Sequence, residues 1–192
     1  MIGAIVLAAG TSKRFGGDKR KAKINEEFSV LSKTIANVAN LVNSVLVVLR
    51  VDDQSFKKEL QTQVHSPNVY YFLAPDSALG MGHSLSNAMT AQDHLTAAMI
   101  VLGDMPFVNR ESLKLLISTY TAHADSAPIV LPTLQGKFGH PVIFDRAYFE
   151  EMSQLKGDRG AKPIIDAHKD KIVTIELEDL GIIRDIDTPT DL

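Results

Sequence analysis

Apolar runs rich in β-branched residues alternate with segments of helical spacing along most of this 192-residue chain. We interpret the following apolar runs as strands: Ile2–Leu7, Val45–Leu49, Val69–Phe72, Ala98–Leu102, Ile129–Leu131 and Ile172–Leu177. Apolar residues at helical intervals predict helices between them, at Val30, Ile35, Val38 and Leu41, at Phe56, Leu60 and Val64, at Leu85, Ala88 and Met89, and at Leu113, Leu116, Ile117 and Tyr120. This order predicts an α/β fold in three layers, with a mostly parallel, doubly wound sheet between helices. Ligands of such folds bind at the carboxyl ends of the strands.

The chain is expected to form one domain over residues 1–192, because no linker, internal repeat or low-complexity segment divides it. Its length and 45% hydrophobic content suffice for a sizeable core. The alternating pattern loosens after residue 132. We therefore expect a core over about residues 1–131 and an appended lobe over about residues 132–192 of the same domain.

Composition and charge exclude several classes of protein. The chain has no cysteine, which excludes disulfides, thiolate metal sites and cysteine nucleophiles and is compatible with a reducing compartment, so we expect a cytoplasmic protein. The apolar run Ile2–Ala9 is too short to cross a membrane and lacks the features of a signal peptide, so we expect a soluble protein with no membrane partner. A net charge of -3 argues against broad binding of nucleic acid.

A loop of glycines and cations follows the first predicted strand directly. Gly10, Gly16 and Gly17 can offer backbone N–H groups to an anion, because no Cβ stands in the way. The cations of this stretch are Lys13, Arg14, Lys19, Arg20, Lys21 and Lys23. Together they suit a triphosphate, although the spacing matches neither a Walker A motif nor the dinucleotide fingerprint. The alternative is a flexible surface loop with solvated cations, and we expect Lys13 and Arg20 to be solvated in either case.

Two aspartates far apart in the sequence each follow a short apolar segment that a proline ends. Asp104 comes directly after the strand at Ala98–Leu102, and Asp187 lies near the C-terminus. If the two carboxylates converge, they need a cation between them, and Mg2+ prefers such oxygen ligands together with phosphate. The alternative is an ordinary turn or N-cap role, as we expect for Asp185 and Asp191.

Three further polar segments are candidates for binding. In "APDSALGMGHSLSNAM", residues 74–89, Gly80 and Gly82 would let the backbone approach a flat ligand, with Ser84 as a hydrogen-bonding or helix-capping residue. A plain turn before a helix is the alternative. The segments "GKFGHPVIFD", residues 136–145, and "LKGDRGAKPII", residues 155–165, lie in the looser lobe, where His140 is the one histidine we single out. The other histidines lack metal-ligand spacing.

Several of these segments resemble motifs of the MobA-like nucleotidyltransferases, in the expected order from Leu7 to Asp191. They are "LAAGTSKRFGGDK" at 7–19, "GDMP" at 103–106, "GHP" at 139–141, "GDRGA" at 157–161 and "DIDTP" at 185–189. The double alanine is similar to the molybdenum cofactor cytidylyltransferases, whereas guanylyltransferases more often carry a double glycine. The segment at 74–89 resembles the family's G-L-G-x-S, but His83 departs from the small polar residue expected there.

The resemblance implies a Rossmann-like nucleotidyltransferase fold and a role for individual residues. It implies that Arg14, Lys19 and Asp104 are catalytic and that Asp104 and Asp187 bind the metal ion. The implied nucleotide-binding residues are Leu7, Ala8, Ala9, Gly10, Arg14, Lys19, Lys23, Gly80, Ser84 and Asp104. His140 and Asp158 would bind the acceptor, and Lys137, Arg159 and Lys162 are further candidates for contact with an anionic pterin phosphate. Lys19 is our choice for the phosphate-binding lysine, and Lys21 and Lys23 are the alternatives.

The implied reaction is transfer of CMP from CTP to the terminal phosphate of molybdenum-bound molybdopterin, with release of pyrophosphate. The implied cofactor is Mg2+, with Mn2+ as a substitute, and a molybdoenzyme that receives the product is a further candidate partner. Such a reaction requires positioning and charge neutralisation, and an ionised phosphate acceptor needs no general base. The alternatives are GTP as the donor, a sugar or polyol phosphate as the acceptor, and a nucleotide-binding regulatory or chaperone protein without turnover.

Overall fold

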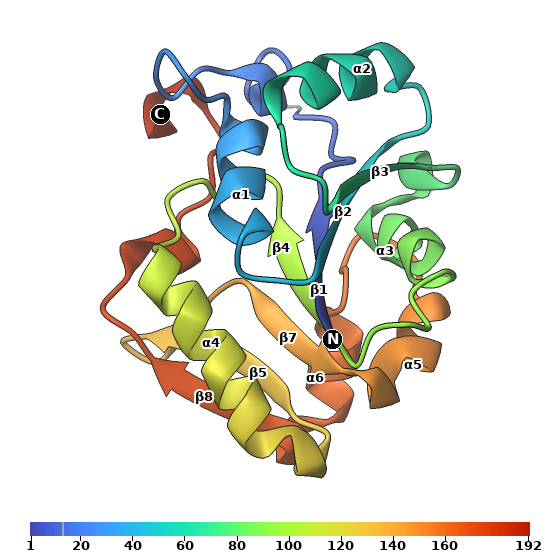
Figure 1. Ribbon diagram of the computed structural model, residues 1–192, viewed down its shortest axis with the longest axis vertical. Coiled ribbons are helices and arrows are strands. Elements are labelled where there is room, and N and C mark those ends of the chain that lie inside the picture. The colour runs from blue at the N-terminus through green and yellow to red at the C-terminus, as the bar shows by residue number, and fades with distance from the viewer. Residues whose placement is uncertain (13) are drawn as a thin grey trace.

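The computed structural model describes residues 1–12 and 14–192, which form an eight-stranded sheet with helices packed on both faces (Figure 1). The strands are β1 (Ile2–Leu7), β2 (Ser44–Arg50), β3 (Val69–Ala74), β4 (Ala97–Leu102), β5 (Ile129–Leu134), β6 (Lys137–Phe138), β7 (Val142–Asp145) and β8 (Ile172–Glu176). The α-helices are α1 (Val30–Ala39), α2 (Gln54–Gln63), α3 (Met81–Met89), α4 (Arg110–His123), α5 (Phe149–Ser153) and α6 (Lys162–Ala167). The order in the sheet is β3-β2-β1-β4-β7-β5-β6, and β8 pairs with β5.

Strand β1 lies inside the sheet and is buried from both sides. Its side chains alternate, so that Ala4 and Val6 pack in the layer of α1, α2 and α4, whereas Ile5 and Leu7 pack in the layer of α3, α5 and α6. A strand covered on both faces is apolar at every position, as expected for a parallel sheet between two helical layers.

The parallel register brings several loops to one edge of the sheet. Leu7, at the end of β1, pairs with Val48 of β2 and with Leu102 of β4. The loops that follow β1, β2 and β4 therefore leave the sheet at the same edge, which is where ligands of open α/β sheets bind. The C-terminal segment also reaches this edge, where the backbone N–H of Ile186 donates to the carbonyl of Asp104 at 3.0 Å.

The predicted α/β class and the mostly parallel sheet are confirmed. The predicted strands correspond to β1 to β5 and β8, and the four predicted helices correspond to α1 to α4. The sequence did not reveal β7, which runs antiparallel between β4 and β5. This strand of four residues follows a polar segment directly, so that its apolar run is too short to stand out. Consequently β6, β7 and β8, which all lie after residue 132, belong to the same sheet as β1.

Within residues 1–12 and 14–192, the structure contains no helix with the length and apolar character needed to cross a membrane.

Candidate active site

A cleft of about 620 Å3 opens at the carboxyl edge of the sheet. The loops after β1, β3 and β4 line it, together with Asp158 and the C-terminal segment at residues 185–187. The predicted site residues that line this cleft are Leu7, Ala8, Ala9, Gly10, Arg14, Lys19, Gly80, Ser84, Asp104, Asp158 and Asp187. Lys23 and His140 do not belong to the described lining. Segments that are distant in the sequence thus form one continuous surface.

Lys19 joins the two aspartates that were predicted to converge. Its Nζ lies 2.7 Å from Asp104 Oδ2 and 3.3 Å from Asp187 Oδ1, and Arg14 Nη2 lies 2.7 Å from Asp187 Oδ2. Burial by itself lowers the pKa of Lys19, but the hydrogen bonds and charges of Asp104 and Asp187 outweigh it and raise the pKa above its ordinary value. Lys19 is therefore a fixed positive charge at neutral pH.

A third carboxylate belongs to this group. Oxygen atoms of Asp104, Asp185 and Asp187 all lie within 4.8 Å of one another. We expected Asp185 to be a turn or cap residue, and Asp191 does have that role, since it accepts hydrogen bonds from the backbone N–H groups of Asp187 and Thr188. The sequence did contain a signal for Asp185, which is its spacing of two residues from Asp187, because residues i and i+2 of an extended segment lie on the same side.

The remaining cations of the glycine-rich loop differ in their surroundings. Lys21 Nζ bonds to Glu59 of α2, and Lys23 is exposed and pairs with Ser29 through a backbone bridge. Lys13 lies outside the described residues. The expectation that Arg20 is solvated was wrong, because Arg20 is 3% exposed and paired with Asp18 and Asp53. Buried guanidinium groups require such carboxylate partners.

The segment between β3 and α3 packs closely against the loop at residues 156–158. Gly82 donates its backbone N–H to the carbonyl of Gly157 at 2.7 Å, and a Cβ at Gly80 or Gly82 would collide with this loop. Gly80, at φ +120°, is the N-cap residue of α3. Ser84 lies within α3 rather than at its cap, and its hydroxyl donates to the carbonyl of Gly80 at 3.2 Å.

The two predicted acceptor residues lie in different positions. Asp158 lines the cleft next to Gly80. His140 is held by its backbone N–H, which donates to the carbonyl of Ile182 at 2.8 Å. Its Nδ1 atom is buried and has no hydrogen-bond partner in the described part of the chain. Burial lowers the pKa of His140, and the charges of Asp104 and Asp185 oppose this shift, so that the imidazole near the acidic group is neutral at pH 7.

Comparisons with known proteins show the family and the fold of this chain. The sequence matches the MobA-like NTP transferase domain over residues 4–172. The purine catabolism protein PucB of Bacillus subtilis (strain 168) is 28% identical over 195 residues, which cover 96% of this chain and 91% of PucB.

Solved structures share the fold. Rv0371c of Mycobacterium tuberculosis H37Rv superposes with a TM-score of 0.80 at 22% identity, covering 99% of this chain and 94% of that one. A complex of Rv0371c with manganese gives a TM-score of 0.77 at 21% identity, covering 99% of this chain and 95% of that one. The 4-diphosphocytidyl-2C-methyl-D-erythritol synthase of Anaerococcus prevotii DSM 20548 gives a TM-score of 0.74 at 18% identity, covering 100% of this chain and 92% of that one.

The family match spans most of the chain and covers both the glycine-rich loop at 7–19 and the motif at 103–106. The protein therefore belongs to the MobA-like NTP transferase family and is a nucleotidyltransferase.

Proposed function

We propose that the protein transfers CMP from CTP to the terminal phosphate of molybdenum-bound molybdopterin, with release of pyrophosphate. The observation that carries the proposal is the position of Lys19, whose ammonium lies between Asp104 and Asp187 in the cleft that Gly10 also lines. A cleft that combines backbone N–H groups, cations and carboxylates in this way suits a triphosphate and its metal ion.

The donor set of the cleft fits a divalent cation. Asp104, Asp185 and Asp187 offer oxygen ligands close together, and two of them already share the ammonium of Lys19. Carboxylates at this separation repel one another unless a cation lies among them, and hard oxygen ligands favour Mg2+ or Mn2+. When bound, such an ion neutralises charge that develops on the transferred phosphate. Our proposed metal ligands are Asp104 and Asp187.

The side chains of the chain itself hold and neutralise the reacting phosphates. Lys19 stays protonated, and Arg14 adds a guanidinium at the rim of the cleft, where 75% of its side chain is exposed. We assign both to the phosphates of the nucleotide. An acceptor that is itself a phosphate monoester is largely ionised near pH 7, so that no general base is needed. We assign Asp158, which lines the cleft, to the acceptor. His140 does not line the cleft, and its assignment to the acceptor rests on its sequence motif alone.

The choice of nucleotide and acceptor rests on the sequence motifs. Ala8 and Ala9 form the double alanine that is similar to cytidylyltransferases, and the segments at 139–141 and 157–161 favour a pterin over a sugar phosphate. The name of the relative PucB refers to purine catabolism, and this name specifies neither a nucleotide nor an acceptor. The synthase of Anaerococcus prevotii has a diphosphocytidyl product in its name, and it keeps a polyol phosphate as the second candidate acceptor.

Pyrophosphate release tests the proposal. The purified protein is incubated with Mg2+ or Mn2+, with each of the four nucleoside triphosphates in turn, and with molybdenum-loaded pterin or a panel of sugar and polyol phosphates. We expect release with CTP and the pterin. Preference for GTP or for a sugar phosphate would overturn the assignment of donor or acceptor.

Asp104→Asn tests whether the reaction takes place at the proposed metal site in the cleft. We expect a loss of kcat/KM on the order of a hundredfold or more, because the variant removes a metal-binding charge at the reacting phosphate while it keeps the shape of the side chain. Asp125→Asn is the matched control, since Asp125 is an exposed aspartate after the end of α4. Undiminished turnover by Asp104→Asn would contradict the metal assignment.

A further inference from the structure

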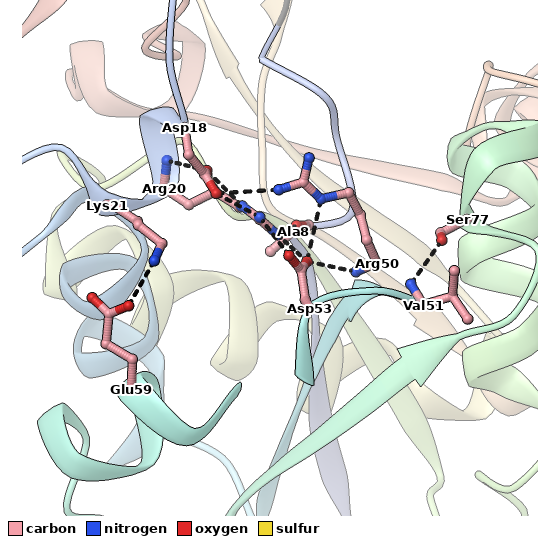
Figure 2. A network of polar contacts seen from close by, with 9 residues as sticks. All are labelled: Ala8, Asp18, Arg20, Lys21, Arg50, Val51, Asp53, Glu59 and Ser77. Atoms are coloured by element: carbon pink, nitrogen blue, oxygen red, sulfur yellow. Dashed lines mark hydrogen bonds and ion pairs between the residues drawn. The ribbon is translucent and has the colours of Figure 1, made fainter. Parts of the chain in front are cut away.

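A buried network of charges lies behind the glycine-rich loop (Figure 2). Its centre is Arg20, whose Nε and Nη2 donate to the two oxygens of Asp18, each at 2.7 Å. Nη1 and Nη2 also donate to the two oxygens of Asp53, and Nη1 donates to the carbonyl of Ala8 at 2.8 Å. These contacts use all five donor hydrogens of the guanidinium.

The three partners of Arg20 come from the segments that shape the cleft. Ala8 is the first residue after β1, where the glycine-rich loop begins. Asp18 is the N-cap of the 3-10 turn Lys19–Lys21, where the loop ends. Asp53 is the residue before α2, and it also accepts the backbone N–H of Arg50 at 2.9 Å. Arg20 therefore joins both ends of the loop to the turn between β2 and α2, and Arg50 at the end of β2 adds contacts to Asp18 at 3.1 Å and to Asp53 at 3.3 Å.

The same turn reaches the opposite wall of the cleft. The backbone N–H of Val51 donates to the hydroxyl of Ser77 at 3.1 Å (Figure 2). Ser77 lines the cleft on the side of the segment at 74–89. The guanidinium of Arg20 further lies over the ring of Phe56, 4.6 Å from its centre, which holds it against α2.

Lys19 and Arg20 are consecutive and their side chains contact different groups. Lys19 contacts Asp104 and Asp187 in the cleft, whereas Arg20 contacts Asp18 and Asp53 behind the loop. A loop that contains glycine loses much conformational entropy when it becomes ordered. If the loop were disordered in the free protein, binding of the nucleotide would have to supply the free energy of ordering the loop. Anchoring Arg20 fixes the turn, and the turn sets the direction of Lys19.

The geometry points to Arg20 as the positioning residue of the triphosphate loop: it holds Ala8, Asp18 and Asp53 so that the loop backbone and Lys19 face the phosphates before the nucleotide binds. This inference rests on the proposed nucleotidyl transfer. Preorganised groups that hold a phosphate lower the barrier because no reorganisation occurs during the reaction, and a displacement of about 1 Å can reduce the rate about a hundredfold.

Arg20→Lys is the most informative variant, because it keeps the charge but cannot form two forked contacts and a carbonyl contact at once. We expect kcat/KM to fall at least tenfold through both a lower kcat and a higher KM for the nucleotide, with the KM for the acceptor unchanged. Arg146→Lys is the matched control, since Arg146 is exposed and its backbone bonds to Thr96 at the opposite edge of the sheet. It should retain activity within twofold.

A purely structural role for Arg20 would lower the melting temperature and leave both kinetic constants unchanged well below unfolding. That result in folded Arg20→Lys would overturn the inference. If Arg20→Lys does not fold, Asp53→Asn tests the same anchor, and the same fall in kcat/KM is expected. Where both variants fold, the double variant should lose less than the product of the two single losses, because both act through one network.

Isothermal titration with Mg2+ and CTP separates this inference from the proposed function. If the protein binds the nucleotide but no acceptor yields pyrophosphate, the proposed function fails. The dissociation constants for CTP then test the role of Arg20. We expect Arg20→Lys to bind CTP at least tenfold more weakly than the unmodified protein, and equal binding would overturn the inference. A protein that neither binds nor turns over any nucleotide would contradict both.

Discussion

At the scale of single residues, the consecutive cations Lys19 and Arg20 contact different parts of the protein. Lys19 contacts Asp104, 85 residues away, whereas Arg20 contacts Asp53, 33 residues away. The sequence identified Lys19 through its motif but left Arg20 as a solvated cation. The reason is that the environment of each cation depends on carboxylates that only the folded chain brings close.

Lys19→Met tests the fixed charge in the cleft. Methionine fills a similar volume without the ammonium, so that Asp104 and Asp187 lose the cation between them. We expect kcat/KM to fall by about two to three orders of magnitude, in line with the loss of a charged donor at a developing negative charge. Steady-state assays of pyrophosphate release measure this, with Lys114→Met on the exposed face of α4 as the control. Activity within twofold of the unmodified protein would show that Lys19 does not touch the reacting phosphates.

At the scale of elements, the turn between β2 and α2 is held by charge. Burial raises the pKa of Asp53, but the hydrogen bonds and charges of Arg20 and Arg50 outweigh it and hold the pKa below its ordinary value. The pair therefore stabilises the fold at pH values above the ordinary pKa of an aspartate, near 4, and this contribution is lost as the pH falls through the lower pKa of the folded state.

Asp53→Asn should consequently lower the free energy of unfolding by about 1–3 kcal/mol at pH 7, since one partner of a buried pair is removed. The difference from the unmodified protein should stay constant between pH 7 and 5 and narrow below about pH 4. Urea unfolding at pH 7, 5, 4 and 3.5 measures it, and Asp125→Asn serves as the exposed control. A difference that persists unchanged to pH 3.5 would show that the Asp53 charge contributes nothing.

The junction between the 74–89 segment and the 156–158 loop depends on the glycine at position 80. Gly80→Ala would place a Cβ against Gly157 and Asp158, in a backbone conformation that L residues rarely adopt. We expect about 2 kcal/mol of destabilisation, measured by urea unfolding. Gly17→Ala should change stability much less, because open space surrounds that position and its φ is not positive. Equal effects of the two variants would contradict this account of the junction.

At the scale of the whole molecule, the sequence predicts those strands and helices that a local pattern of apolar residues marks. Apolar runs and helical spacing identified β1 to β5, β8 and α1 to α4, and the loops after β1 and β4 place Gly10, Lys19 and Asp104 at one edge of the sheet. The antiparallel insertion of β7 could not be predicted, because its register with β4 is a long-range contact that no local pattern encodes. The position of Asp185 was missed for a similar reason, since its approach to Asp104, in the loop after β4, is also a long-range contact.

The same long-range contacts make the cleft an assembly of distant segments. The loop after β1, the segment after β4 and the C-terminal segment meet at Lys19, Asp104 and Asp187. A site of this kind forms only when the whole sheet forms, so that binding of nucleotide should stabilise the entire domain against unfolding.

The proposed reaction in this cleft joins a nucleotide to an acceptor phosphate. Mass spectrometry of the acceptor after incubation with CTP and a divalent cation tests it most directly, with pyrophosphate quantified in the same sample. We expect molybdenum-loaded pterin that carries one added CMP for each pyrophosphate released, and loss of both products in Asp104→Asn. Pyrophosphate without a modified acceptor, or CMP on a sugar phosphate in preference to the pterin, would contradict it.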